Sequence, residues 1–147
     1  MIIYLDTCCY NRPFDDQRIL RNAVETSAIM SIIDICGIIG HIIIGSRAVT
    51  FEHSNISASG LRAAVGELYD KTITYSVRIT ADTSARATAL QEYGMGRMDS
   101  FHLAAAEAGN ADVLLTVDDD FEHIVANKKL SSVRVINPVN FLTEVMI

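Results

Sequence analysis

Short apolar runs alternate with segments of helical periodicity along this chain of 147 residues. The apolar runs have the length of β-strands, and they lie at residues 1–5, 41–46, 73–79, 113–115 and 133–136. Apolar residues recur at helical spacing between them, which predicts helices at residues 17–37, 47–55, 61–68, 80–93, 99–108 and 121–125, with a helical turn after Pro138. Residues 11–16 are predicted to form a loop, because Pro13 disfavours helical backbone at the preceding residue.

This alternation of strands and helices predicts the fold class. A strand, a helix and the next strand form a right-handed crossover, so the chain is expected to build a parallel sheet with helices on both faces. The length suits one domain, and no internal repeat, low-complexity segment or linker divides it. We therefore predict a single α/β domain over residues 1–147 with a three-layer α/β/α arrangement.

Composition narrows the class of protein. Half of the residues are apolar, and the net charge of −6 argues against nucleic-acid binding by bulk positive charge. No run of 18 uninterrupted apolar residues predicts a membrane span, and the first residues lack a basic segment typical of a secretion signal. The odd number of cysteines (Cys8, Cys9 and Cys36) indicates reduced thiols that fill the core. These features favour a cytoplasmic protein.

Carboxylates stand at the positions where an open α/β sheet binds its ligands, just beyond the carboxyl ends of the strands. Asp6 ends the first strand and Asp118 follows the fourth, while Glu52 and Asp99 lie near the starts of two helices. Oxygen ligands of this kind suit Mg²⁺ or Mn²⁺, and no set of cysteines and histidines has zinc spacing. The run from Asp118 to Asp120 is open to a simpler interpretation, a solvated acidic helix start.

With these motifs the chain resembles the PIN-domain ribonucleases over nearly its whole length. The similar blocks are Tyr4-Leu5-Asp6-Thr7, Glu52, Asp99-Ser100-Phe101-His102-Leu103-Ala104-Ala105-Ala106 and Thr116-Val117-Asp118-Asp119-Asp120-Phe121. The resemblance implies a metal-dependent endoribonuclease that leaves 5′-phosphate and 3′-hydroxyl ends, and it points to the toxin of a VapBC-type type II toxin–antitoxin pair. An antitoxin protein and a homodimer are the partners implied. Residues 8–16 depart from the family pattern and are expected to form an unusual first loop.

The resemblance also implies residue roles. Asp6, Glu52, Asp99 and Asp118 would bind Mg²⁺ or Mn²⁺, Thr116 would support them, and Asp120 matches an acidic position that is variably used. Thr7 is placed to hydrogen-bond Asp6 or to orient a metal-bound water.

Histidines and arginines near these acids have two interpretations each. We interpret His102 and His53 as surface or packing residues, because the proposed chemistry needs no histidine base. Arg12, Arg47 and Arg97 are candidates for phosphate contacts, since a guanidinium binds phosphate in a bidentate manner, although each can equally be a solvated surface charge. The sequence itself leaves the RNA target open.

The main alternative function is a catalytically silent PIN-like module that acts as a protein- or RNA-binding scaffold. The presence of all four acids argues against it. A haloacid-dehalogenase phosphatase is disfavoured, because Thr7 and Cys8 follow Asp6 where that class needs a second aspartate. A receiver domain is disfavoured because the strand after Gly40 ends in Gly45-Ser46 instead of a phospho-acceptor aspartate.

Overall fold

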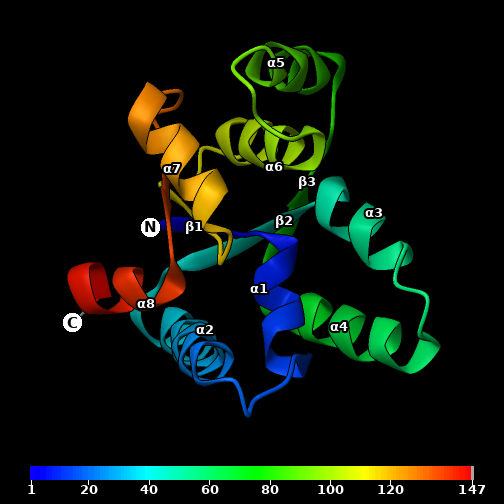
Figure 1. Cartoon of the computed structure of the whole chain (residues 1–147), viewed down its shortest axis with the longest axis vertical. Coiled ribbons are helices and arrows are strands. Elements are labelled where there is room, and N and C mark those ends of the chain that lie inside the picture. Colours follow the sequence, from blue (N-terminus) through cyan, green and yellow to red (C-terminus); the bar gives the residue numbers. More distant parts are fainter. Residues whose placement is uncertain (147) are drawn as a thin grey trace.

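The computed structural model describes residues 1–146 and shows a five-stranded parallel sheet (Figure 1). The strands lie in the order β3-β2-β1-β4-β5, and every neighbouring pair is parallel. Their bounds are β1 Ile2–Leu5, β2 Ile42–Ser46, β3 Tyr75–Val77, β4 Val113–Leu115 and β5 Arg134–Ile136. The five predicted strands are therefore confirmed, with β3 shorter than expected at the edge of the sheet.

Helices cover both faces of this sheet. Their bounds are α1 Thr7–Asn11, α2 Leu20–Ile39, α3 Arg47–Ser54, α4 Ser59–Thr72, α5 Ala81–Gln91, α6 Arg97–Ala108, α7 Asp119–Lys128 and α8 Pro138–Phe141, with a 3₁₀ turn η1 Arg12–Phe14 and a π-helical turn η2 Leu142–Met146. In Figure 1, α5, α6 and α7 lie on one side of the sheet, and α1, α2, α4 and α8 lie on the other. The predicted three-layer α/β/α fold is confirmed.

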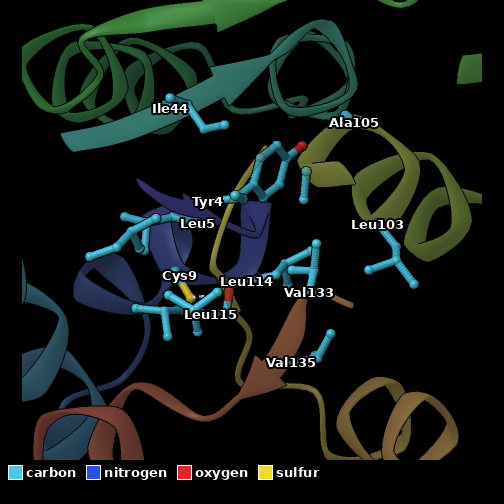
Figure 2. Close-up of a cluster of buried hydrophobic side chains, with 14 of the residues drawn as sticks. Tyr4, Leu5, Cys9, Ile44, Leu103, Ala105, Leu114, Leu115, Val133 and Val135 are labelled. Atoms are coloured by element: carbon cyan, nitrogen blue, oxygen red, sulfur yellow. Dashed lines mark hydrogen bonds between the residues drawn. The ribbon is translucent and has the colours of Figure 1, made fainter. Parts of the chain in front are cut away.

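The core is continuous across the central strands. All of β1 except its first residue is at most 1% exposed, as expected for a strand with neighbours on both sides and helices on both faces. Figure 2 shows the Tyr4 ring directed toward Ala105 of α6, and it shows Cys9 beside Leu115 of β4. The Cys9 thiol donates a hydrogen bond to the Leu115 carbonyl, so this cysteine is a core residue, as predicted.

The segment after β1 differs from the prediction. Residues 7–11 form the helix α1 and residues 12–14 a 3₁₀ turn, where the sequence predicted an irregular first loop. The reason is local: the Asp6 carboxylate accepts the Thr7 backbone N–H at 2.7 Å and caps the helix, and Pro13 sits in the first turn of η1, where its missing N–H costs nothing. Asp6 is thereby fixed between a strand and a helix.

The long helix α2 also differs in its bounds. It passes through Gly37 and ends at Ile39, because Gly40 adopts the left-handed conformation (φ +78°) that terminates helices. Among residues 1–146, α2 is the one helix that is long and apolar enough, by length and composition, to cross a membrane. Polar residues interrupt its apolar sequence, so the criterion of 18 uninterrupted apolar residues does not identify it. It nevertheless carries the buried Glu25, which is paired with two arginines, and it packs against α8 and β2.

Candidate metal centre at the carboxyl edge of the sheet

Asp6 is the buried centre of the candidate site. It is 5% exposed, and its Oδ2 accepts the Thr116 hydroxyl at 2.8 Å while its Oδ1 accepts the Thr7 N–H. Thr116 comes directly after β4, which pairs with β1, so the parallel register brings these two strand ends together. The structure therefore places both threonines named from the sequence against Asp6.

Glu52 and His102 complete a compact cluster with Asp6. The His102 Nε2 forms a short contact with Glu52 Oε1 and lies 3.3 Å from Asp6 Oδ1. The Thr7 hydroxyl donates to the same Glu52 oxygen at 2.8 Å. His102 is completely buried, so it is not a surface residue; it packs against the Tyr4 ring and also contacts two of the predicted metal ligands. The sequence does contain a clue to this position of His102. Asp99 lies three residues before it, and residues three apart on a helix share a face.

Two buried hydroxyls fix the far side of the His102 ring. The Tyr4 hydroxyl lies 2.7 Å from His102 Nδ1 and 2.6 Å from the Ser46 hydroxyl. Ser46 also accepts the Ala48 backbone N–H, so it caps α3, the helix that carries Glu52. Burial raises the pKa of Tyr4 well above its usual value, and the side chain stays a neutral hydroxyl. The Tyr4–Ser46 pair thus ties the orientation of His102 to the start of α3.

Asp99 and Asp118 extend the negative charge outward. Asp99 is partly buried in the first turn of α6, and burial together with the Asp6 and Asp118 carboxylates raises its pKa to about 7. Asp118 is exposed, and its Oδ1 accepts the backbone N–H groups of Asp120 and Phe121, so it caps α7. This capping supports the interpretation of Asp118 to Asp120 as an acidic helix start, at least for Asp118. Asp120 lies exposed in the first turn of α7.

Within residues 1–146, no lysine or arginine forms an ion pair with Asp6, Glu52, Asp99 or Asp118. Among the residues the structure describes, Asp6 and Glu52 form ion pairs with His102 alone, and Asp99 and Asp118 form none. Burial opposes protonation of His102, but the Asp6 charge and the hydrogen bond and charge of Glu52 outweigh it and raise the His102 pKa. Burial alone would raise the Glu52 pKa, but the hydrogen bonds with His102 and Thr7 and the charges of His102 and His53 together lower it. The cluster therefore keeps a surplus of negative charge.

Sequence comparison and structure comparison give different results for this chain. No protein-family model and no curated protein matches its sequence. The structure, however, is similar to that of FitAcB from Neisseria gonorrhoeae, with a TM-score of 0.59 over 92% of this chain and 97% of that one, at 14% sequence identity. The fold is PIN-like. At this identity the similarity establishes the arrangement of helices and strands and leaves the activity to be argued from the site.

Within this PIN-like fold, the donor set fits a divalent cation. Asp6, Glu52 and His102 each offer a ligand atom, and these atoms lie within 4.8 Å of one another. Carboxylate oxygens are the preferred ligands of Mg²⁺ and Mn²⁺, whereas the two ring nitrogens of His102 are engaged by Glu52 and Tyr4. Repulsion among the carboxylates is the cost that a bound cation would remove.

The three arginines named from the sequence and His53 lie in three different settings. Arg12 is paired with Glu25 and Asp15 and donates to Asn22, so its guanidinium is engaged within the fold. Arg47 and Arg97 are exposed on the groove between α3 and α6. His53 is buried against the rings of Tyr10 and Tyr69, in the packing role expected of it.

Proposed function

We propose that this chain is a divalent-metal-dependent endoribonuclease and the toxin component of a type II toxin–antitoxin pair. The observation that carries the proposal is the acidic cluster at the carboxyl edge of a PIN-like sheet, which has His102 as its one ion-pair partner among the described residues. A purely structural carboxylate cluster at this depth would be expected to have cationic partners, because buried charges are paired or bind metals. The resemblance of the acidic motifs to PIN-domain ribonucleases selects RNA as the substrate.

Some side chains of the site would bind the metal ion, and others hold these ligands in place. Asp6, Glu52, Asp99 and Asp118 would hold Mg²⁺ or Mn²⁺, and Asp120 would add a further carboxylate at the rim. The bound cation would supply an activated water and neutralise charge on the scissile phosphate. Thr116 and Thr7 fix the two Asp6 oxygens through the hydroxyl and backbone hydrogen bonds given above. His102 holds Glu52 and Asp6 at a common point, because its ring is clamped from behind by Tyr4.

The antitoxin partner and the homodimer belong to the same proposal and rest on the family resemblance, whereas the proposed cytoplasmic location rests on the reduced thiols. An adjacent open reading frame that encodes a small protein with a DNA-binding amino-terminal part would support the toxin role. Co-expression should then yield a stable complex of the two proteins, measured by size-exclusion chromatography with light scattering.

Cleavage of RNA by the purified chain tests the nuclease itself. We expect cleavage with Mg²⁺ or Mn²⁺, none with EDTA, and 5′-phosphate ends on the products. Hydrolysis of a small aryl phosphate should be absent. A protein that binds Mn²⁺ but leaves every RNA substrate intact would favour the silent scaffold, and a protein that binds neither would reject both functions.

A further inference from the structure

Polar groups hold the His102 ring from both sides and determine which of its nitrogens carries a proton. The Nε2 atom faces the carboxylate oxygens of Glu52 and Asp6, the second at 3.3 Å. The Thr7 hydroxyl also lies 3.3 Å from Nε2, but it donates its single proton to Glu52. Carboxylates, and a hydroxyl that has donated its proton elsewhere, can only accept hydrogen bonds. Among the described residues Nε2 therefore has acceptors alone around it and is the donor.

The other nitrogen, Nδ1, lies at the end of a chain of two hydroxyls. The Tyr4 hydroxyl is 2.7 Å from Nδ1 and 2.6 Å from the Ser46 hydroxyl, and all three side chains are completely buried. In Figure 2 the Tyr4 hydroxyl points toward α6, the helix that carries His102. Ser46 also accepts the Ala48 backbone N–H at the start of α3. Because the chain is buried, the groups within it decide the direction of its hydrogen bonds.

Only one direction of this chain satisfies both hydroxyls. If Ser46 donates to Tyr4 and Tyr4 donates to Nδ1, each hydroxyl proton has a partner and Nδ1 is an acceptor. In the opposite direction Nδ1–H donates to Tyr4 and Tyr4 donates to Ser46, which leaves the Ser46 proton without an acceptor in residues 1–146. A buried donor without a partner is unfavourable, because its hydration is lost and not replaced. The chain therefore favours the tautomer with the proton on Nε2.

The position of this proton decides whether the imidazole can bind a metal ion. A protonated Nε2 has no lone pair to offer. Ligation through Nε2 would move the proton to Nδ1, reverse the hydroxyl chain and break the donation to Glu52 and Asp6. A cation in the cluster would then be held by oxygen atoms only. Oxygen ligands suit Mg²⁺ and Mn²⁺, whereas an imidazole ligand favours Zn²⁺.

We propose that the Tyr4 hydroxyl keeps His102 out of the coordination sphere, as a hydrogen-bond donor to Glu52 and Asp6, and thereby sets the preference of the centre for Mg²⁺ or Mn²⁺ over Zn²⁺. The inference rests on the metal centre of the proposed nuclease and adds a residue outside the acidic set that determines its metal specificity. Tyr4 acts through His102 and contacts neither the cation nor the substrate, so it is a positioning residue.

The protonation of the His102 nitrogens can be measured without RNA. Nitrogen-15 NMR spectra are recorded on protein labelled at its four histidines, with and without Mg²⁺, and His102 is assigned from the signals that are missing in His102→Gln. Protonated and unprotonated imidazole nitrogens resonate far apart. We expect Nε2 to carry a proton in both samples. An unprotonated Nε2 in the Mg²⁺ sample would overturn the inference.

Tyr4→Phe tests the hydroxyl itself, because it removes the donor to Nδ1 and keeps the ring. Calorimetric titrations should show Mn²⁺ binding weakened about tenfold, within the range for groups that orient metal ligands. Zn²⁺ binds most sites more tightly than Mn²⁺, so the informative quantity is the change in the ratio of the two dissociation constants. This ratio should shift toward Zn²⁺ by about tenfold. In Zn²⁺ the variant should have an unprotonated Nε2 and the wild type a protonated one.

Tyr10→Phe is the matched control. Tyr10 is as completely buried as Tyr4, but its hydroxyl has no hydrogen-bond partner in residues 1–146. Its removal should leave both dissociation constants within about twofold, because no hydrogen bond is lost. If Tyr4→Phe folds and its ratio equals that of Tyr10→Phe, the inference is rejected. If Tyr4→Phe does not fold, the wild-type spectrum in Zn²⁺ decides, and an unprotonated Nε2 there rejects the inference.

The outcome for the nuclease is read separately. A wild-type chain that cleaves RNA but has an unprotonated Nε2 in Mg²⁺ keeps the nuclease function and rejects the role of Tyr4. A chain that has a protonated Nε2 and shows the expected shift in Tyr4→Phe, yet cleaves no RNA, keeps the role of Tyr4 and rejects the nuclease. A chain that binds neither Mn²⁺ nor Zn²⁺ rejects both.

Discussion

Two buried carboxylate clusters in this protein are built in opposite ways. Glu25 of α2 is 3% exposed, and its oxygens lie 2.9 Å from Arg12 and from Arg21, with the Asn137 amide donating a further hydrogen bond. The cluster around Asp6 has several carboxylates and only His102 as a cationic partner among the described residues. One buried acid has two arginines, whereas several acids share one imidazole.

This difference in charge compensation indicates that the Glu25 cluster has a structural role and that the Asp6 cluster is a binding site. Glu25 joins η1, α2 and the start of α8, and Arg21 continues the network to Asp119 and the Val117 carbonyl, so the compensated cluster holds segments together. Among residues 1–146 the Asp6 cluster has no arginine or lysine partner, and burial together with the neighbouring Asp6 and Asp118 charges raises the pKa of Asp99. Such repulsion lowers stability unless a ligand removes it. We therefore expect mutations in the two clusters to affect different properties.

The largest effect should follow from Asp99→Asn. Loss of this carboxylate removes a proposed ligand, so RNA cleavage should fall by about a thousandfold or more, in line with the loss of metal activation. The melting temperature of the metal-free protein should stay the same or rise, because the substitution relieves the repulsion between Asp99 and the carboxylates of Asp6 and Asp118. The rise in melting temperature on adding Mn²⁺ should shrink, because this rise reports binding to the native state.

Asp119→Asn is the matched control for this experiment. Asp119 is exposed beside the site and paired with Arg21, so its loss should cost at most about 1 kcal/mol and leave cleavage within about twofold. If Asp99 only stabilises the helix start, asparagine should replace it well. An undiminished Mn²⁺ shift in Asp99→Asn would end the claim that Asp99 is a ligand.

Glu25→Gln should show the reverse pattern. It leaves Arg12 and Arg21 facing a neutral amide in a buried position, and breaking a buried ion pair costs about 3 kcal/mol or more. Urea unfolding should record this loss of stability. At a temperature where the variant is folded, the Mn²⁺ affinity should match wild type. Weakened metal binding with unchanged stability would show that the compensated cluster is part of the functional site.

Most of the fold could be predicted from the sequence, because its parallel strands are unbroken apolar runs. The runs that became β1, β2 and β4 needed no tertiary information, and Ser46, Thr80 and Gly109 marked helix ends that the structure contains. The end of α2 was misplaced, because Gly37 and Gly40 are equal candidates in sequence and only the backbone shows which adopts a positive φ.

The site was harder to predict than the fold. The acids were identified from their places at strand ends and helix starts, but His102 was assigned to packing. A histidine on an apolar helix is ordinarily a packing residue, and its partners Tyr4 and Glu52 are 98 and 50 residues away in sequence. The Arg12–Glu25 pair was missed for the same reason, since the pairing depends on how η1 folds back on α2.

The pH dependence of stability should differ between wild type and Asp99→Asn. The Asp99 pKa rises from 3.8 to about 7 in the folded state, so folded protein holds this proton more tightly than unfolded protein. The contribution of Asp99 to stability is therefore lost as pH rises from about 4 through about 7, by on the order of 1–2 kcal/mol after solvent screening. Melting curves in EDTA should fall over this window more steeply for wild type. Parallel curves would show that Asp99 is not perturbed by its neighbours.

The smallest effect should come from Cys8, although it touches the site. Its Sγ lies 3.3 Å from Asp6 Oδ2 and 3.4 Å from the Thr116 hydroxyl. A hydrogen bond with Cys9, burial and the Asp6 charge raise the Cys8 pKa well above its usual value, so the thiol stays protonated and is a poor metal ligand. Sulfur is a weak donor, and Asp6 keeps its two stronger hydrogen bonds without it.

Cys8→Ala should consequently keep RNA cleavage within about threefold and cost about 1 kcal/mol of stability or less, the usual value of one hydrogen bond. Thr116→Val is the informative partner variant, because it removes the 2.8 Å hydroxyl donor from the same Asp6 oxygen at nearly constant volume. We expect it to lower cleavage about tenfold, within the range for groups that orient metal ligands. If Cys8→Ala folds normally but loses activity while Thr116→Val retains it, the thiol and not the hydroxyl would be the group that orients Asp6.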